Sequence, residues 1–436
     1  MTADPATAPA AEPLVLHGDA FARGRAQAEL CPDSIAAVRA TVEARLHGAA
    51  ALLASPRITR YLDAQCEFAS QHDPEGMAEM FGIAAGYGVT ARALFAFLHA
   101  GQLSGLPDDG CSAWAFVDPA QGAMVVKNRD LRGPALPLQR VFRHTDPAWG
   151  GRTVLCVGSL GAPGAYSSGI NSDGFALVDT QVVTTDQGVG LLRYFMMTRL
   201  LAGCASVDEA IAALHAMTHA GGGTLVLADA GGTIAAVEIG HSGVAVQRRT
   251  TGWLARTNHF LAPGLSDRLA AAPGDPGPDV SRARLARLTA WFGHRRAAPA
   301  LAEAAAIMAS HDDAAGTARR SMTSATPSAA TTIPAALSGD NVSPNSNQAM
   351  TAVVGGVRYI RLDTLVAAPC RISRNSKEMA PIDNASTDHT SAPIIGAFQR
   401  TCIVSSIHAA GSVTANAAPN CTSVPTRKSK WAQNRF

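Results

Sequence analysis

Hydrophobic residues recur every three or four positions through the first hundred residues, which is the spacing of amphipathic helices. The clearest example is DSIAAVRATVEARLHGAAALLA, which begins at Asp33, and the pattern continues to His99. The same spacing returns in four later stretches: 188–204, 206–223, 281–294 and 299–311. Ser206 precedes the second of these as a helix N-cap would, and glycines end it. These regions predict helices.

Strand patterns begin at Cys111. CSAWAFVD (111–118) and AMVVKNRD (123–130) flank the turn sequence PAQG, which predicts a β-hairpin. Further strand patterns cover 153–161, 175–183, 224–240 and 243–250, the third with a Gly-Gly turn inside it. Helices followed by hairpins, then helices and hairpins again, predict an α+β layered sandwich with antiparallel sheets.

Composition and charge exclude several classes of protein. The chain has 436 residues, 47% of them hydrophobic, which is enough for one large domain or two ordinary ones. A net charge of +2 gives no sign of a nucleic-acid surface. No uncharged apolar run is long enough to span a membrane. Residues 1–13 are rich in Ala and Pro and lack the apolar core of a signal peptide, so a disordered arm is expected.

The eight cysteines are scattered and form no CxxC pair. This distribution argues against a zinc site and against a disulfide scaffold. It fits a reducing compartment, so we expect a cytoplasmic protein.

Composition changes near residue 320. Ser, Thr and Asn account for 36 of the first 320 residues but for 35 of the last 116. In this later part only 355–370 has a fair strand pattern. Segment 321–436 is therefore expected to be either a poorly ordered tail or the product of a reading-frame error, and no chemistry is assigned to it.

Cys111 is the first candidate for chemistry. A lone cysteine is often a buried small hydrophobe, and that reading stays open for this one. Three features favour a reactive thiol instead. Gly110 leaves the preceding peptide sterically open. The GLPDDG sequence before Cys111 resembles an exposed loop, and the paired strand ends in the polar residues Asn128, Arg129 and Asp130.

Cleavage of the Gly110–Cys111 bond would give Cys111 a free α-amino group with an ordinary pKa of about 7.7 to 8.0. Nucleophile and general base would then belong to one residue. Arg129 would favour the thiolate. Asp130 could hold the ammonium or orient the arginine, although these two residues could also be an exposed strand-end ion pair.

Several motifs in order resemble one enzyme family. They are FARGRAQAEL (21–30), GCSAW…VVKNRD, SSGINSDGFALV, GTIAAVEIG and RTNHF. Together they are similar to the isopenicillin N acyltransferase-like family of self-processing cysteine hydrolases. These are N-terminal-nucleophile enzymes related to the choloylglycine hydrolases. The resemblance covers about 14–320 and implies a four-layer αββα sandwich, with a helical segment 14–110 released from a catalytic segment 111–320.

The resemblance also implies roles for single residues. Cys111 matches the nucleophile, Asp130 the aspartate that contacts the catalytic amine, and Asn258 the asparagine whose amide helps bind the oxyanion. The second oxyanion donor is expected near Thr180 and Gln181. A late family arginine corresponds to Arg319 or Arg320, although the cysteine and histidine that flank it in the family are missing here.

Other polar residues have simpler readings. Asn258 alone could cap a turn, and Asn171, in GINSDG, is expected to be a turn residue more than a substrate ligand. His259 and His311 are expected to be structural or surface residues. Arg23 and Arg25 are expected to form structural ion pairs.

Three hypotheses follow. The first is a self-cleaving amidase or acyltransferase for a small-molecule amide or acyl-CoA-type substrate, which needs no cofactor and whose two fragments stay associated. No P-loop or dinucleotide motif follows a predicted strand. The second is a Cys-His hydrolase that stays one chain. The third is an inactive or ligand-binding remnant of the fold.

Overall fold

The structure, a computed structural model, describes residues 12–103, 110–118, 122–130, 133–271, 275–309, 353–354, 357–358 and 401–407. Arg319, Arg320, His311 and most of segment 321–436 lie outside the described residues.

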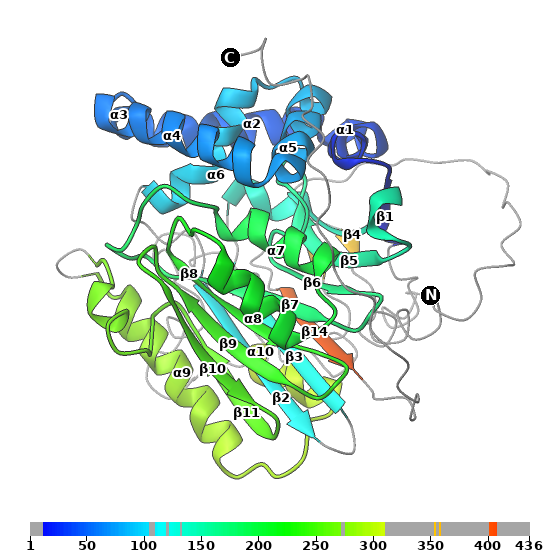
Figure 1. The fold of residues 1–436 in the computed structure, drawn as a ribbon, viewed down its shortest axis with the longest axis vertical. Helices are drawn as coiled ribbons and strands as arrows, with labels where there is room; N and C mark the ends of the chain where they lie inside the picture. Colours follow the sequence, from blue (N-terminus) through cyan, green and yellow to red (C-terminus); the bar gives the residue numbers. More distant parts are fainter. Residues whose placement is uncertain are drawn as a thin grey trace, which may run out of the picture.

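Two β-sheets stack face to face in the middle of the molecule (Figure 1). The larger sheet has the strand order β1-β4-β5-β6-β7-β8-β9-β10. Its strands are β1 (Leu14–His17), β4 (Gln139–Thr145), β5 (Thr153–Ser159), β6 (Ser168–Asn171), β7 (Ala176–Gln181), β8 (Gly223–Ala228), β9 (Ile234–Ile239) and β10 (Val244–Arg249). The smaller sheet has the order β11-β2-β3-β14. Its strands are β11 (Gly252–Arg256), β2 (Gly110–Asp118), β3 (Gly122–Asp130) and β14 (Thr401–Ile407).

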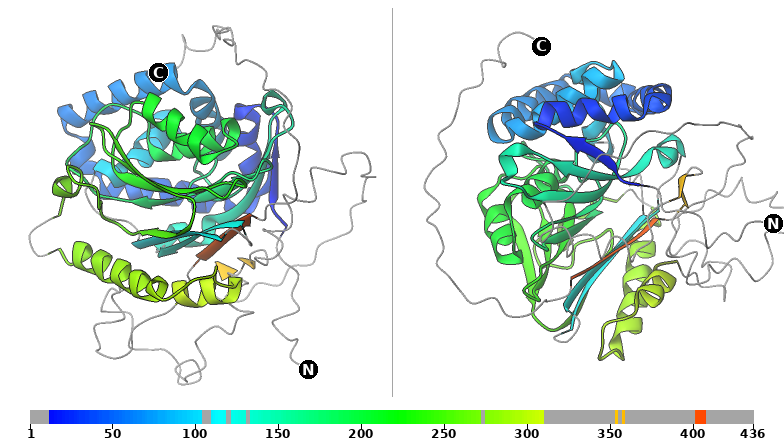
Figure 2. Two further views of the ribbon diagram at one scale, coloured as in Figure 1. Left: turned by 60° about the horizontal axis from the view of Figure 1, so that its bottom comes forward. Right: turned by 90° about the vertical axis from the view of Figure 1, so that its right-hand side faces the viewer.

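Helices cover the outer face of each sheet, as the two views of Figure 2 show. The larger sheet carries α1 (Ala20–Leu30), α2 (Ile35–Gly48), α3 (Ala50–Leu53), α4 (Pro56–His72), α5 (Pro74–Tyr87), α6 (Ala91–Leu103), α7 (Arg193–Gly203) and α8 (Val207–Ala216). The smaller sheet carries α9 (Gly277–Gly293) and α10 (Leu301–Ala309). The predicted four-layer αββα order is confirmed.

Alternation along the strands explains why four layers form. Side chains of successive strand residues point to opposite faces. Leu177 and Leu225 belong to the core under the helices, whereas Val178 and Val226 pack between the sheets. Both faces of the larger sheet are therefore apolar, and each is buried against another layer.

The helix and strand predictions are confirmed at most positions. Ser206 caps α8, its Oγ accepting from the backbone N–H of Glu209 at 3.2 Å. The predicted hairpin is present, with β2 and β3 paired antiparallel.

Two details of the larger sheet were not expected from the sequence. Segment 14–110, expected to be helical, begins with a strand, because β1 pairs with β4. That pairing is parallel, so the larger sheet is not purely antiparallel. A four-residue strand has too short a period-2 pattern to stand out in sequence, and its partner lies more than a hundred residues away.

The tail also holds more strand than the sequence indicated. β14 pairs antiparallel with β3, and its sequence TCIVSSI has the β-branched residues of a strand. Within the predicted strand 355–370, only β13 (Val357–Arg358) is described as strand, paired with β12 (Val353–Val354).

Within the described part of the chain, no single helix is long and apolar enough to cross a membrane. Helices α5 and α6 together reach the length and composition of a span, but the pair is bent by 114°.

Candidate active site

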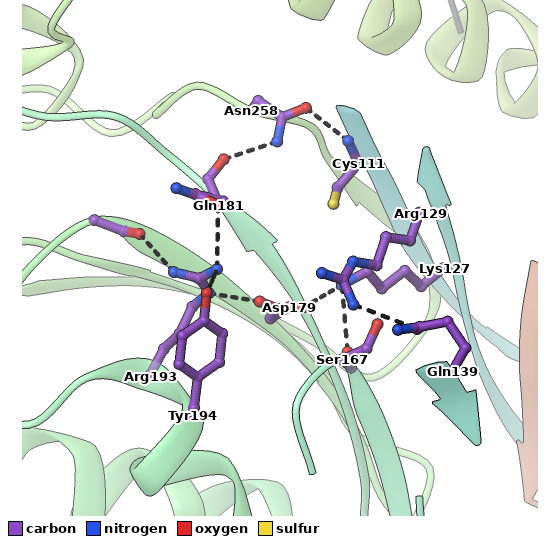
Figure 3. A network of polar contacts seen from close by, with 11 residues as sticks. Cys111, Lys127, Arg129, Gln139, Ser167, Asp179, Gln181, Arg193, Tyr194 and Asn258 are labelled. Carbon is purple, nitrogen blue, oxygen red and sulfur yellow. Dashed lines mark hydrogen bonds and ion pairs between the residues drawn. The ribbon is translucent and has the colours of Figure 1, made fainter. Parts of the chain in front are cut away.

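Cys111 is the second residue of β2 and is 3% exposed. Its strand neighbours on the same face, Ala113 and Ala115, pack in the core between the two sheets. Its sulfur therefore points toward the larger sheet, and Figure 3 shows it directed into the space between Gln181 and Arg129. The thiol is at the end of the inter-sheet core, where apolar packing gives way to polar side chains.

The backbone of Cys111 is held at both of its polar groups. Its N–H donates to Oδ1 of Asn258 at 2.8 Å, and its carbonyl accepts from the guanidinium of Arg284. Asn258 is held in turn, because its Nδ2 donates to the carbonyl of Gln181 at 2.8 Å (Figure 3). The nucleophile candidate is thus connected to β7 through one asparagine side chain.

The predicted oxyanion role of Asn258 remains a prediction. The side-chain amide nitrogen of Asn258 carries two N–H groups, of which one donates to the carbonyl of Gln181. The other could donate to an oxyanion. The contact with the Cys111 N–H was not foreseen.

Arg284 is the main site residue that the sequence analysis missed. It is 3% exposed, and besides the Cys111 carbonyl it donates to Ser112 Oγ at 2.9 Å and to Asn258 Oδ1 at 2.6 Å. Burial lowers its pKa, while the nearby Asp130 and Cys111 act in the opposite direction. A signal was present in the sequence: Arg284 shares the buried face of α9 with Leu288, where an apolar residue is expected.

A second group of side chains fixes the backbone of Asn258. Its N–H donates to Ser281 Oγ at 2.8 Å, and Ser281 also contacts Nδ1 of His259 at 2.7 Å and Thr257 Oγ1 at 3.0 Å. Burial lowers the pKa of His259 to about 4, with nearby arginines adding to the effect. His259 is therefore neutral near pH 7 and engaged with α9, in the structural role expected from the sequence.

Asp130 and Arg129 lie directly across the hairpin from the cleavage-site candidates. Gly110 pairs with Asp130, and Cys111 pairs with Arg129. Asp130 is 4% exposed and accepts from Asn128 Nδ2 at 2.8 Å, so it is not part of an exposed ion pair. Cross-strand partners share a face, so Arg129 lies on the thiol side of the hairpin and Asp130 on the α9 side, with Arg284.

A buried ion network lies beside the site on β7. Lys127 and Arg193 both bind the carboxylate of Asp179, the latter through Nε at 2.5 Å (Figure 3). Burial alone would raise the pKa of Asp179, but the two cations outweigh it and hold the pKa below its usual range. Because Lys127 belongs to the smaller sheet and Asp179 to the larger one, the network ties the two sheets together next to Cys111.

A cavity of about 310 Å³ opens next to these groups. Arg129, Gln181 and Tyr194 form part of its wall, so it reaches the side of the site to which the thiol points. The rest of its lining is largely apolar and comes from α2, α6 and the β5 region, including Val38, Val42, Phe97, Leu138 and Leu160. This size is at the lower end for small-molecule sites.

The remaining sequence candidates are placed as follows. Thr180 is buried on β7 beside Gln181. Asn171 ends β6 and holds the turn that follows, because its Oδ1 accepts from the backbone N–H groups of Asp173 and Phe175 at 3.1 and 3.0 Å. Among the described residues, no three His, Cys, Asp or Glu side chains are grouped to hold a metal ion.

Arg23 and Arg25 form the expected ion pairs. Arg23 is buried against Asp146, with Glu79 at 3.9 Å, and Arg25 pairs with Glu29 at 2.8 Å on the surface. The FARGRAQAEL motif therefore anchors α1 and does not reach the thiol.

Comparison with known proteins supports the family resemblance. Residues 117–317 match the model of a family described as acyl-coenzyme A:6-aminopenicillanic acid acyl-transferase. The match begins inside β2, after Cys111, and ends before Arg319 and Arg320. The resemblance inferred from the sequence is confirmed over this segment, and the nucleophile candidate lies just outside it.

Solved structures with a detectable likeness include a hydrolase and an acylase. A conjugated bile acid hydrolase from Clostridium perfringens is 13% identical, with 45% of this chain and 78% of that chain covered and a TM-score of 0.31. A penicillin V acylase from Agrobacterium tumefaciens is 15% identical, with 32% and 50% covered and a TM-score of 0.26. Curated proteins gave no significant match.

Proposed function

We propose that this protein is a self-processing cysteine hydrolase or acyltransferase that acts on small-molecule amide or acyl substrates, with Cys111 as its nucleophile. One observation carries the proposal. The backbone nitrogen of Cys111, which would become the free amine, is held by Asn258, while the sulfur of the same residue points between Gln181 and Arg129, two residues of the cavity wall. Nucleophile, base and substrate space would then meet at one residue.

Maturation would begin with attack of the Cys111 sulfur on the carbonyl carbon of Gly110. The new C–S bond forms as the C–N bond to Cys111 breaks, and the released nitrogen takes up the thiol proton. Water then hydrolyses the thioester, which gives the Gly110 carboxylate and restores the thiol. Both reacting residues belong to β2, so the strand fixes their relative orientation before the reaction.

Turnover would repeat this chemistry on an external acyl group. The Cys111 amine removes the thiol proton, the thiolate attacks the substrate carbonyl, and an acyl-cysteine forms as the amine or thiol leaving group departs with that proton. Water gives hydrolysis, and a second amine gives acyl transfer. An apolar acyl group fits the lining of the 310 Å³ cavity.

The Cys-His alternative has little support among the described residues. His259 is the histidine adjacent to Asn258, and its Nδ1 is occupied by Ser281 and Thr257. With a pKa of about 4, it is also a weak base.

The test is the intact mass and N-terminal sequence of the purified protein. Wild type should give two chains, the heavier one beginning at Cys111 and the lighter one ending at Gly110. Cys111→Ala should stay full-length and inactive, and Cys111→Ser should cleave slowly at best, because a hydroxyl is the poorer nucleophile at neutral pH.

Cys66→Ala is the matched control, since Cys66 is a free, half-buried thiol on α4. It should mature and turn over as wild type does. A soluble wild type that hydrolyses amides as one 436-residue chain would refute self-processing, and a soluble chain that neither cleaves nor hydrolyses would indicate a remnant of the fold.

A further inference from the structure

Two nitrogen donors converge on one oxygen in the candidate site. Oδ1 of Asn258 accepts from the backbone N–H of Cys111 at 2.8 Å and from Nη2 of Arg284 at 2.6 Å. Because the two nitrogens share an acceptor, the distance between them cannot exceed the summed lengths of these two hydrogen bonds. A buried guanidinium therefore borders the atom that becomes the α-amine on cleavage.

We propose that Arg284 is a positioning residue which anchors Cys111 after cleavage and keeps its new α-amino group in the uncharged form. The inference rests on the proposed self-processing at Gly110–Cys111. It gives the buried arginine of α9 a role in setting the lowest pH at which the mature enzyme works.

The anchoring part follows from the contacts. Cleavage removes the covalent bond that precedes Cys111, so the residue becomes the free end of β2, and strand ends fray unless they are tied down. Arg284 binds the Cys111 carbonyl and Asn258 binds its nitrogen. Both ends of the residue stay held without the peptide bond.

The electrostatic part follows from distance and burial. A like charge within about 4–6 Å disfavours the protonated form of an amine. Arg284 is almost fully buried, so water and salt screen its charge weakly. An α-amino group ordinarily titrates at about 7.7 to 8.0, so a downward shift makes it a free base at neutral pH.

Other charged groups face the same amine. From β3, the carboxylate of Asp130 favours the protonated amine and so opposes Arg284. Arg129, across from Cys111, disfavours the protonated amine as Arg284 does. A Cys111 thiolate would also favour the protonated amine. His259, in the loop after β11, is neutral near pH 7. Arg284 is the cation that shares a hydrogen-bond acceptor with the amine, so its removal should dominate the change.

The experiment compares the pH profiles of kcat/KM for mature wild type, Arg284→Gln and Arg284→Lys. The substrate is the acyl p-nitroanilide that wild type hydrolyses fastest in a series from acetyl to octanoyl. The fall of kcat/KM at low pH, the acid limb of the profile, reports the pKa of the catalytic base in the free enzyme. Arg284→Gln keeps a donor for Asn258 but loses the charge, so its acid limb should move up by about one pH unit. Arg284→Lys should stay near wild type.

Arg282→Gln is the matched control, because it removes the same charge from an exposed position on the same helix. Its acid limb should not move. An Arg284→Gln limb that coincides with wild type, even at a reduced rate, would overturn the inference, since a purely structural loss lowers the rate without moving the limb. An equal shift in Arg284→Lys would overturn it as well.

The mass of wild type separates this inference from the function on which it rests. A wild type that does not begin at Cys111 refutes the proposed function, whereas cleaved wild type with an unmoved Arg284→Gln limb refutes only the role of Arg284. If Arg284→Gln does not mature, maturation becomes the readout. Cleavage of Arg284→Lys but not of Arg284→Gln supports the role of the charge, which also favours the Cys111 thiolate. If neither Arg284→Lys nor Arg284→Gln matures, the role of the charge is contradicted.

Discussion

Gly110 and Asp130 are so close across the hairpin that a larger residue before Cys111 would displace the Asp130 side chain. A Cβ placed on Gly110 would lie 2.6 Å from Oδ2 of Asp130. Asp130 cannot move freely, because it is buried and bound to Asn128. At this position the carboxylate of Asp130 favours glycine, and the proposed cleavage would also need an accessible Gly110 carbonyl.

Gly110→Ala should therefore slow maturation by about tenfold or more, since small displacements at a reacting centre have large effects on rate. Once cleaved, the heavy chain has the wild-type sequence, so turnover per cleaved molecule should approach the wild-type value. Cleavage followed by mass spectrometry, and activity normalised to cleaved chain, measure the two effects.

Asp130→Asn is the contrasting variant, because Asp130 remains in the heavy chain. It should slow both maturation and turnover while the fold is kept. Wild-type rates in Asp130→Asn, or equal losses of turnover in both variants, would contradict these roles.

At the scale of single elements, α5 begins with an unusual carboxylate. Asp73 caps it by accepting from the N–H of Gly76 at 3.3 Å, yet it is almost completely buried. Burial raises its pKa to about 6, against the opposing effects of the Gly76 hydrogen bond and Arg199. The folded protein therefore holds this proton more tightly than the unfolded chain does.

The sign of the pH effect follows from that difference. The stability contributed by protonated Asp73 is complete below about pH 4 and is lost as pH rises through about 6. An asparagine side chain at this position would cap the helix without a charge. As pH rises from 4 to 7, the free energy of unfolding of Asp73→Asn should therefore increase relative to that of wild type, by up to about 3 kcal/mol.

Urea unfolding at several pH values measures this gain. Asp19→Asn, at the exposed N-cap of α1, is the control and should show no comparable trend. A constant difference between Asp73→Asn and wild type across this range would show that Asp73 titrates no differently in the folded and unfolded states.

For the whole molecule, the arrangement of the layers predicts what happens to the light chain after cleavage. Strand β1 is part of the larger sheet, paired with β4. Gln27 exchanges hydrogen bonds of 3.0 Å with Gly161 and Ala162, and Arg23 pairs with Asp146. The first hundred residues thus share a sheet, a core and buried polar contacts with the rest.

Mature protein should therefore elute as one species from size exclusion in native buffer and separate into two bands on a denaturing gel. The apolar core that joins the chains contains fully buried side chains from both of them, as the interfaces of obligate complexes do. Release of the light chain under native conditions would contradict this prediction.

The sequence by itself determined the features that depend on neighbouring residues. Period-2 alternation and a turn sequence were enough to predict β2 and β3, and the hairpin register then brings Asp130 and Arg129 opposite Gly110 and Cys111. The helices were predictable for the same reason, because an apolar face repeats locally. The family resemblance came from motifs inside these elements.

Only the tertiary structure decided which distant segments meet. β1 joins β4, Asn258 binds the nitrogen of Cys111, and Arg284 reaches its carbonyl from 173 positions away. No local pattern specifies such contacts, since they depend on how sheets and helices pack as layers. The position of Arg284 on an apolar helix face indicated a buried partner, but the partner itself was fixed by the packing of α9 against β2 and β11.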